Sequence, residues 1–151
     1  MSDLVVDANV AVKWVIEEEH SDRSQKLFED TVRARDRLIG PPMLISEVVS
    51  VIYQRLRSKD PERHISEQEA EAALERFLAL PVLVVAPEGL YAKSFSLARA
   101  HGLTNTYDSQ YVALAEILGV ELWTDDRALL KALDARAQWV RSIGDYPLDS
   151  P

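Results

Sequence analysis

The stretch LTNTYDSQYVALAEILGVELWTDDR, residues 103–127, decides the fold. Its pattern predicts a helix that begins at Thr106 or Asp108 and ends at Gly119, because glycine commonly terminates helices. A short apolar strand is then expected over residues 121–124. A helix that leads into a buried strand is the repeating unit of α/β folds, which place their chemistry at the boundaries between such elements. The acids at the two boundaries of this stretch are therefore candidates for function.

The rest of the chain alternates between short apolar runs and amphipathic segments. We expect further strands over residues 4–6, 38–39, 82–85 and 139–140, and helices over residues 8–19, 21–35, 43–58, 66–80, 87–100 and 125–135. This alternation predicts a three-layer α/β domain, with a central, mainly parallel sheet flanked by helices. The sequence contains no internal repeat or interdomain linker, so we expect one domain over residues 1–146 and a tail over residues 147–151.

The composition indicates a cytoplasmic globular protein. The chain has 151 residues, of which 47% are hydrophobic and 28% charged, enough for one sizeable core. No apolar run reaches the length of about 18 residues that a membrane span needs. The first residues carry an acid, Asp3, where a signal peptide would carry positive charge. Cysteine is absent, which excludes a disulfide framework, a thiol nucleophile and a cysteine-ligated zinc site.

The formal net charge of −8 argues against a protein that coats nucleic acid, because such proteins neutralise phosphates with basic residues. The 17 Lys and Arg residues face 25 Asp and Glu residues. If four of the acids belong to one metal site, the remaining charges are close to balanced. The charge is therefore compatible with a metal-dependent nuclease.

Four acids stand out by their positions. Asp7 follows the first strand, Asp126 follows the strand at residues 121–124, and Asp108 opens a helix. Glu47 lies on the inner side of its helix, on or beside the apolar stripe. Because parallel strands carry ligand sites outside their carboxyl ends, Asp7 and Asp126 are expected to converge. Each aspartate taken alone is better explained as a helix cap, and Glu47 is equally well explained as a stripe-edge side chain that reaches solvent. The functional interpretation therefore rests on all four together.

Converging carboxylates would need a cation. Two of them about 4 Å apart repel by roughly 4 kcal/mol at an effective dielectric near 20. They would raise one another's pKa values unless a cation offset the charge. No cysteine exists and no histidine adjoins any of the four, so the ligands would be oxygens, which suit Mg²⁺ or Mn²⁺ better than zinc. Such acidic sites chiefly serve phosphoryl chemistry.

Four segments, taken in order, resemble the motifs of one family. Residues 5–14, VVDANVAVKW, resemble the opening motif of PIN-domain ribonucleases, in particular the small VapC-type toxins of toxin–antitoxin pairs. Residues 41–48 match the second motif, an acid inside a helix after a proline-marked loop. Residues 107–115, YDSQYVALA, resemble the third, and residues 122–127, LWTDDR, the fourth. The resemblance covers almost the whole chain at compatible spacing.

The resemblance implies a PIN fold and an endoribonuclease that depends on Mg²⁺ or Mn²⁺ and hydrolyses RNA phosphodiester bonds. Carried over by position, the catalytic and metal-binding acids would be Asp7, Glu47, Asp108 and Asp126. Asn9 and Thr124 match polar positions that support the site. The resemblance also implies a homodimer and a cognate antitoxin that binds across the active site.

The doubled acid after the last clear strand departs from the family pattern, which has one acid here. Its distance from Thr124 and the following Arg127 select Asp126 as the ligand and leave Asp125 as a helix cap. Lys13 is a candidate for contact with a substrate phosphate, although a solvated lysine fits its position at least as well. A basic stretch is more simply a solvated helix end than a guide for RNA; it comprises Arg55, Arg57, Lys59 and Arg63.

Other readings of the acids lack a required residue. A haloacid-dehalogenase-like phosphatase needs a second aspartate two residues after Asp7, where this chain has Asn9. A response-regulator receiver needs its acid pair after the first strand, and no serine-hydrolase elbow or nucleotide-binding glycine motif occurs. The three histidines, His20, His64 and His101, lie in polar or helix-end contexts. A catalytically silent PIN-like module for binding or dimerisation is the remaining non-enzymatic alternative.

Overall fold

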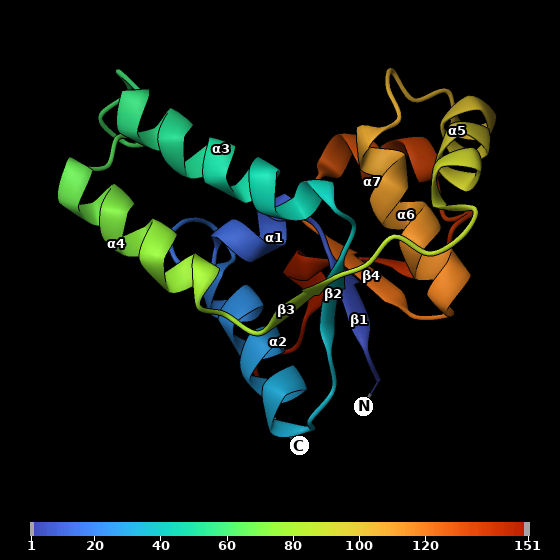
Figure 1. Ribbon diagram of the computed structural model, residues 1–151, viewed down its shortest axis with the longest axis horizontal. Helices are drawn as coiled ribbons and strands as arrows, with labels where there is room; N and C mark the ends of the chain where they lie inside the picture. Colours follow the sequence, from blue (N-terminus) through green and yellow to red (C-terminus); the bar gives the residue numbers. More distant parts are fainter. Residues whose placement is uncertain (1, 150–151) are drawn as a thin grey trace.

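The computed structural model describes residues 2–149 and has a five-stranded sheet at its centre (Figure 1). The strands are β1 (Leu4–Val6), β2 (Leu38–Gly40), β3 (Val82–Val84), β4 (Glu121–Thr124) and β5 (Val140–Ser142). Their order is β3-β2-β1-β4-β5, and every neighbouring pair is parallel. β1 is central and pairs with both β2 and β4, which come from distant parts of the chain. The expected parallel sheet is confirmed.

Helices lie on both faces of the sheet, which confirms the expected three layers. They are α1 (Ala8–Val12), α2 (Ser21–Arg33), α3 (Met43–Arg57), α4 (Glu67–Leu78), α5 (Leu90–His101), α6 (Tyr107–Leu118) and α7 (Arg127–Leu133), followed by a 3-10 turn, η1 (Ile143–Asp145). Figure 1 shows α3 and α4 side by side, extending away from the sheet, with α5 and α6 together on the opposite side. α6 packs against β1 and β4, while α5 covers α6.

The burial of α6 follows from its composition. Residues 111–115, with the sequence YVALA, are all buried, so the helix is enclosed on several sides instead of presenting one apolar stripe. Gly119 ends α6 in the left-handed conformation, at a φ of 68°, as the sequence predicts. The position of α6 between the sheet and α5 fixes the direction in which its first turn faces.

Local features set where α3 and α4 begin. Ser66 and Glu69 form a capping box at the start of α4, where the sequence predicts a helix from residue 66. Gly40 ends β2 just before α3, and a Cβ placed on it would lie 2.3 Å from Cδ2 of the buried Leu44. Glycine at this position therefore allows α3 to begin directly beside the sheet.

The expected helix over residues 8–19 is wrong, because α1 ends at Val12. The chain then turns, held by bonds that compete with a helix. The Ser21 hydroxyl donates to the carbonyl of Ile16 and accepts the backbone N–H of Glu18. Ser21 is consequently the first residue of α2 and not its cap. The residue before it, His20, has a left-handed φ of 66°.

The other differences lie at element ends. β3 is an edge strand whose side chains are largely exposed, although the sequence suggested only an apolar strand. Tyr146 is buried, and its hydroxyl donates to Asp30 at 2.6 Å, so packing reaches at least to this residue. The division into a domain and a tail stays a prediction, and residues 1, 150 and 151 lie outside the described residues. Among residues 2–149, no helix has the length and apolar character needed to cross a membrane.

Candidate active site

The four candidate acids come from four elements that meet at one edge of the sheet. β1 and β4 are adjacent, so Asp7 and Asp126, which follow them, lie at the same carboxyl edge. The backbone N–H of Asp7 donates to the carbonyl of Trp123 at 3.4 Å, which continues the pairing beyond β1. Asp108 lies in the first turn of α6, which packs against both strands. Glu47 lies near the start of α3, which packs against α1.

Asp7 is buried, with 6% of its surface exposed. One carboxylate oxygen accepts the backbone N–H of Val10 at 3.0 Å, which caps α1. The other oxygen accepts the hydroxyl of Thr124, which is fully buried. The same Thr124 hydroxyl accepts the backbone N–H of Asp126 at 3.0 Å. Thr124 thus links Asp7 to the loop that carries Asp126.

Burial and mutual repulsion perturb these carboxyl groups. The pKa of Asp7 is raised to about 7, chiefly by burial and also by the negative charges of Asp126 and Asp108, against the opposing bonds from Thr124 and Val10. The pKa of Asp108 is also raised, first by burial and then by the charge of Asp126. The negative charge of each of these aspartates therefore disfavours ionisation of a neighbouring one.

Glu47 is held by Tyr111, a buried residue of α6. The buried Tyr111 hydroxyl donates to Oε1 of Glu47. Burial raises the pKa of Glu47, the bond from Tyr111 lowers it, and the charge of Asp108 raises it. The pKa of Tyr111 lies well above its ordinary value, because of burial and the nearby carboxylates, so the hydroxyl keeps its proton. The three-residue spacing from Asp108 along α6 was the signal for this role.

Replacing Tyr111 with phenylalanine is expected to raise the pKa of Glu47. The substitution removes a hydrogen bond to a charged group, which typically contributes about 1.5–3 kcal/mol. Titration of carbon-13-labelled glutamate carboxyl groups by NMR measures the change. Tyr107→Phe, which removes an exposed hydroxyl from the same helix, is the control and should leave Glu47 unchanged. An unaltered Glu47 titration in Tyr111→Phe would contradict the proposed bond.

The residue that caps α7 is Asp126, although the sequence predicts Asp125. Asp126, and not Asp125, caps α7, since its carboxylate accepts the backbone N–H of Leu129 at 3.0 Å. The assignment of Asp125 as the cap is therefore wrong. Its carboxylate lies 3.0 Å from Nζ of Lys13 and 3.2 Å from Nδ1 of His20. Capping leaves Asp126 with a second oxygen, so its expected role as a ligand stays a prediction.

Lys13 is not a solvated lysine. Its side chain is 4% exposed, and Nζ lies 2.8 Å from Glu18 in addition to the contact with Asp125. Arg55 is also buried, and its guanidinium lies 2.7 Å from Glu18, so it is not part of a solvated helix end. We call these residues, together with His20, the buried ion-pair network. A phosphate could bind Lys13 only by displacing a carboxylate. Asn9, on α1, is exposed.

The donor set fits a hard divalent cation in kind. Among residues 2–149, the side chains as placed form no ready-made group of three His, Asp or Glu residues that could hold a metal ion. The oxygens of Asp7 are engaged by Thr124 and Val10, and one oxygen of Glu47 is engaged by Tyr111. All four candidates offer only oxygen, which suits Mg²⁺ or Mn²⁺, and a cation would offset the repulsion that raises the aspartate pKa values.

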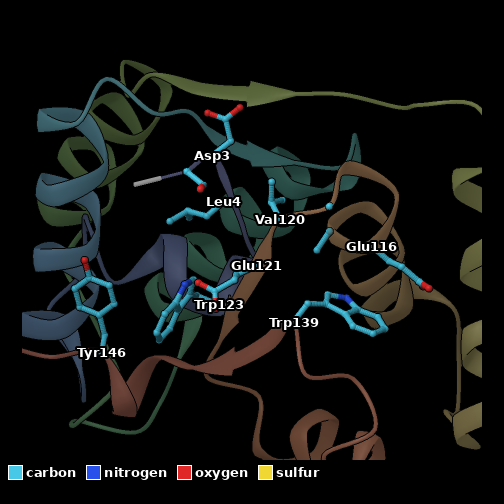
Figure 2. Close-up of a pocket in the computed structure, with 11 residues that line it drawn as sticks. Asp3, Leu4, Glu116, Val120, Glu121, Trp123, Trp139 and Tyr146 are labelled. Atoms are coloured by element: carbon cyan, nitrogen blue, oxygen red, sulfur yellow. The ribbon is translucent and has the colours of Figure 1, made fainter.

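A large cavity lies elsewhere, at the amino ends of β1 and β4. Its volume is about 600 Å³. Figure 2 shows Trp123, Trp139 and Tyr146 around it, with Leu4 and Glu121 at the starts of the two strands. Asp7 and Asp126 follow the opposite ends of these strands, so the cavity is separate from the carboxylates.

Comparison with known proteins identifies the family. The family model described as the PIN domain matches residues 4–135. The chain belongs to the PIN-domain family. This PIN domain is 31% identical over 132 residues to "Ribonuclease VapC3" from Pyrobaculum aerophilum, a match that covers 87% of this chain and 95% of the relative. That similarity makes it a VapC-type member and confirms the resemblance seen in the motifs.

A solved structure supports the fold of this PIN domain. The crystal structure of PAE2754 from Pyrobaculum aerophilum superposes with a TM-score of 0.64, at 22% sequence identity. The match covers 95% of this chain and 93% of that one. At this identity the likeness concerns the fold alone.

Proposed function

We propose that this VapC-type protein is an endoribonuclease that depends on Mg²⁺ or Mn²⁺ and hydrolyses phosphodiester bonds in RNA. The observation that carries the proposal is Asp7, a buried carboxylate whose pKa is raised to about 7 by burial and by two neighbouring aspartates. The charged form of such a group is unfavourable in the folded protein, and a bound cation would stabilise it. Membership of the PIN-domain family and the relative named as a ribonuclease support the same activity.

Four acids would hold the cation: Asp7, Glu47, Asp108 and Asp126. A bound divalent ion supplies a water of lowered pKa and offsets negative charge at the scissile phosphate. The protein itself keeps these acids oriented. Thr124 donates to Asp7 and accepts from the backbone of Asp126, while Tyr111 donates to Glu47. Asn9, exposed on the same short helix that Asp7 caps, is proposed as a further supporting residue.

The biological role that we propose is that of the toxin in a toxin–antitoxin pair. The partners would be an RNA substrate, a cognate antitoxin and a second copy of the chain, acting in the cytoplasm. The support is the VapC-type identity of the chain. A small antitoxin gene beside this one would be the simplest independent support.

The test is cleavage of RNA by the purified protein with Mg²⁺ and with EDTA. Asp108→Asn is expected to lower the cleavage rate at least about 100-fold, the size of effect that follows from losing one preorganised electrostatic group. The matched control is Glu116→Gln, on the same helix, where the acid pairs with Lys93. Circular dichroism verifies that both variants fold.

Cleavage that persists in EDTA, or at the wild-type rate in folded Asp108→Asn, would overturn the proposal. Failure of the wild-type protein to cleave any RNA would favour the silent binding module. The observation that favours this alternative is that no three acidic or histidine side chains among residues 2–149 are already arranged to hold a metal ion.

A further inference from the structure

A hollow beside the candidate site is lined by the second half of α5 and by the loop that leads into α6. Its volume is about 340 Å³, and Phe95, Arg99, Thr104 and Asn105 are among its lining residues. The loop ends at Thr106, two residues before Asp108. No acidic side chain is among the residues that line it.

Phe95 presents an aromatic face to solvent. Of the three phenylalanines, Phe77 is buried and Phe28 packs against the core, whereas 62% of the surface of Phe95 is exposed. Tyr107, which directly follows the loop, is 58% exposed. Exposing an aromatic ring to water is costly, and an exposed ring in a hollow is the kind of platform on which proteins stack nucleobases.

Arg99 gives the hollow a positive charge, which sets it apart from the arginines that line other hollows. Arg37, Arg55 and Arg76 line other hollows, and each already binds a protein oxygen. Within residues 2–149, no protein oxygen forms a hydrogen bond or ion pair with the Arg99 guanidinium. In a chain with a net charge of −8, an unengaged guanidinium beside exposed aromatic rings suits a phosphodiester ligand.

The hollow is rigidly connected to Asp108. The buried Ser109 hydroxyl donates to the backbone carbonyl of Ser94 at 2.8 Å, which fastens the first turn of α6 to α5. Ser94 precedes Phe95 and Ser109 follows Asp108, so this bond fixes the two functional positions relative to one another. The Asn105 side chain accepts the backbone N–H of Tyr107 at 2.9 Å and holds the loop in place.

We infer that this hollow is a nucleobase subsite for single-stranded RNA, in which a base stacks on Phe95 and Arg99 contacts the neighbouring phosphate. The inference rests on the proposed ribonuclease function and places one nucleotide of the substrate in the hollow. A duplex keeps its bases stacked inside and cannot offer a base face to Phe95, whereas an unpaired strand can. The substrate is therefore single-stranded at the nucleotide that occupies the hollow.

The test is binding of a fluorescein-labelled single-stranded RNA in EDTA, followed by fluorescence anisotropy, with RNA integrity checked on a gel. Phe95→Ala should weaken binding about 10-fold, within the range for loss of one stacked base, and Phe95→Trp should restore it. Arg99→Gln should reduce the slope of log Kd against log salt by about 0.7, the value for one phosphate contact on a single strand. Neither substitution should alter binding of a duplex of the same sequence.

The matched control is Tyr53→Ala, which removes an aromatic ring of similar exposure, 58%, from α3. Sedimentation velocity tests whether a second copy of the chain covers Phe95 instead. The inference requires that Phe95→Ala weakens single-strand binding with unchanged sedimentation, and any other result overturns it. If the wild-type protein neither binds nor cleaves RNA, the proposed function fails; if it does both and Phe95→Ala behaves like Tyr53→Ala, only the subsite fails.

Discussion

Asp7→Asn should abolish RNA cleavage and, in metal-free buffer at pH 8, stabilise the folded protein. Both effects have one cause. The buried carboxylate is unfavourable in its charged form, because it loses hydration and lies near Asp108 and Asp126. Asparagine removes the charge and remains a good cap, since its side-chain oxygen can still accept the N–H of Val10. It removes the anionic ligand at the same time.

The sign follows from proton binding. The pKa of Asp7 is about 7 in the folded protein, against the ordinary 3.8, so the folded state binds the proton more tightly. The contribution of Asp7 to the free energy of unfolding is fully present below about pH 4 and is lost as the pH rises through 7. At 1.36 kcal/mol per pH unit, the full loss is about 4 kcal/mol at pH 8. We expect Asp7→Asn to recover about 2–4 kcal/mol there, because weaker bonding to Thr124 offsets part of the gain.

Urea unfolding in EDTA at several pH values measures this effect. The advantage of Asp7→Asn should shrink progressively from pH 7 towards pH 4. Mg²⁺ should stabilise the wild-type protein and not the variant, because a ligand stabilises only the state that binds it. Asp149→Asn, at an exposed position, is the control and should show no dependence of either kind. A variant less stable than the wild type at pH 8 would contradict the buried, repelled carboxylate that the structure assigns to Asp7.

Local signals explain why most of the fold could be predicted. The capping box at Ser66 and the left-handed Gly119 depend on nearby residues alone, so their positions in the sequence set the ends of α4 and α6. The carboxyl-edge placement of Asp7 and Asp126 also followed, because adjacent parallel strands end on the same side. Four motifs in family order added the PIN fold, which periodicity alone would not have named.

The failures concern side chains whose partners lie far away along the chain. Lys13 follows a helical pattern, yet it lies just beyond the end of α1, and its ammonium group contacts Asp125 from a distant part of the chain. The choice between Asp125 and Asp126 as the cap depended on this contact, which no spacing rule contains. The hydrogen bond from the Tyr111 hydroxyl could not be predicted for the same reason, since its partner Glu47 belongs to α3. Sequence patterns predict which face a residue occupies but not the identity of its partner.

Lys13→Met should lower the free energy of unfolding by about 3 kcal/mol. Removing one partner of a buried ion pair typically costs about 3–5 kcal/mol, because the remaining charge stays poorly hydrated. Here Glu18 keeps Arg55 and Asp125 keeps His20, and both carboxylates retain some exposure, which places the expected loss at the lower end. Urea unfolding at pH 7.5 measures it, with Lys131→Met, an exposed lysine in α7, as the matched control.

A double-mutant cycle then separates the pair from other effects of the substitution. Asp125→Asn should destabilise the wild-type protein but cost much less in the Lys13→Met background, since the carboxylate has by then lost its lysine. The same variants decide between the two roles considered for Lys13. A phosphate contact predicts weaker RNA binding with unchanged stability, whereas the buried ion-pair network predicts lost stability with a small effect on the salt dependence of RNA binding. Unchanged stability in Lys13→Met would contradict the ion-pair role and favour a contact between Lys13 and a substrate phosphate.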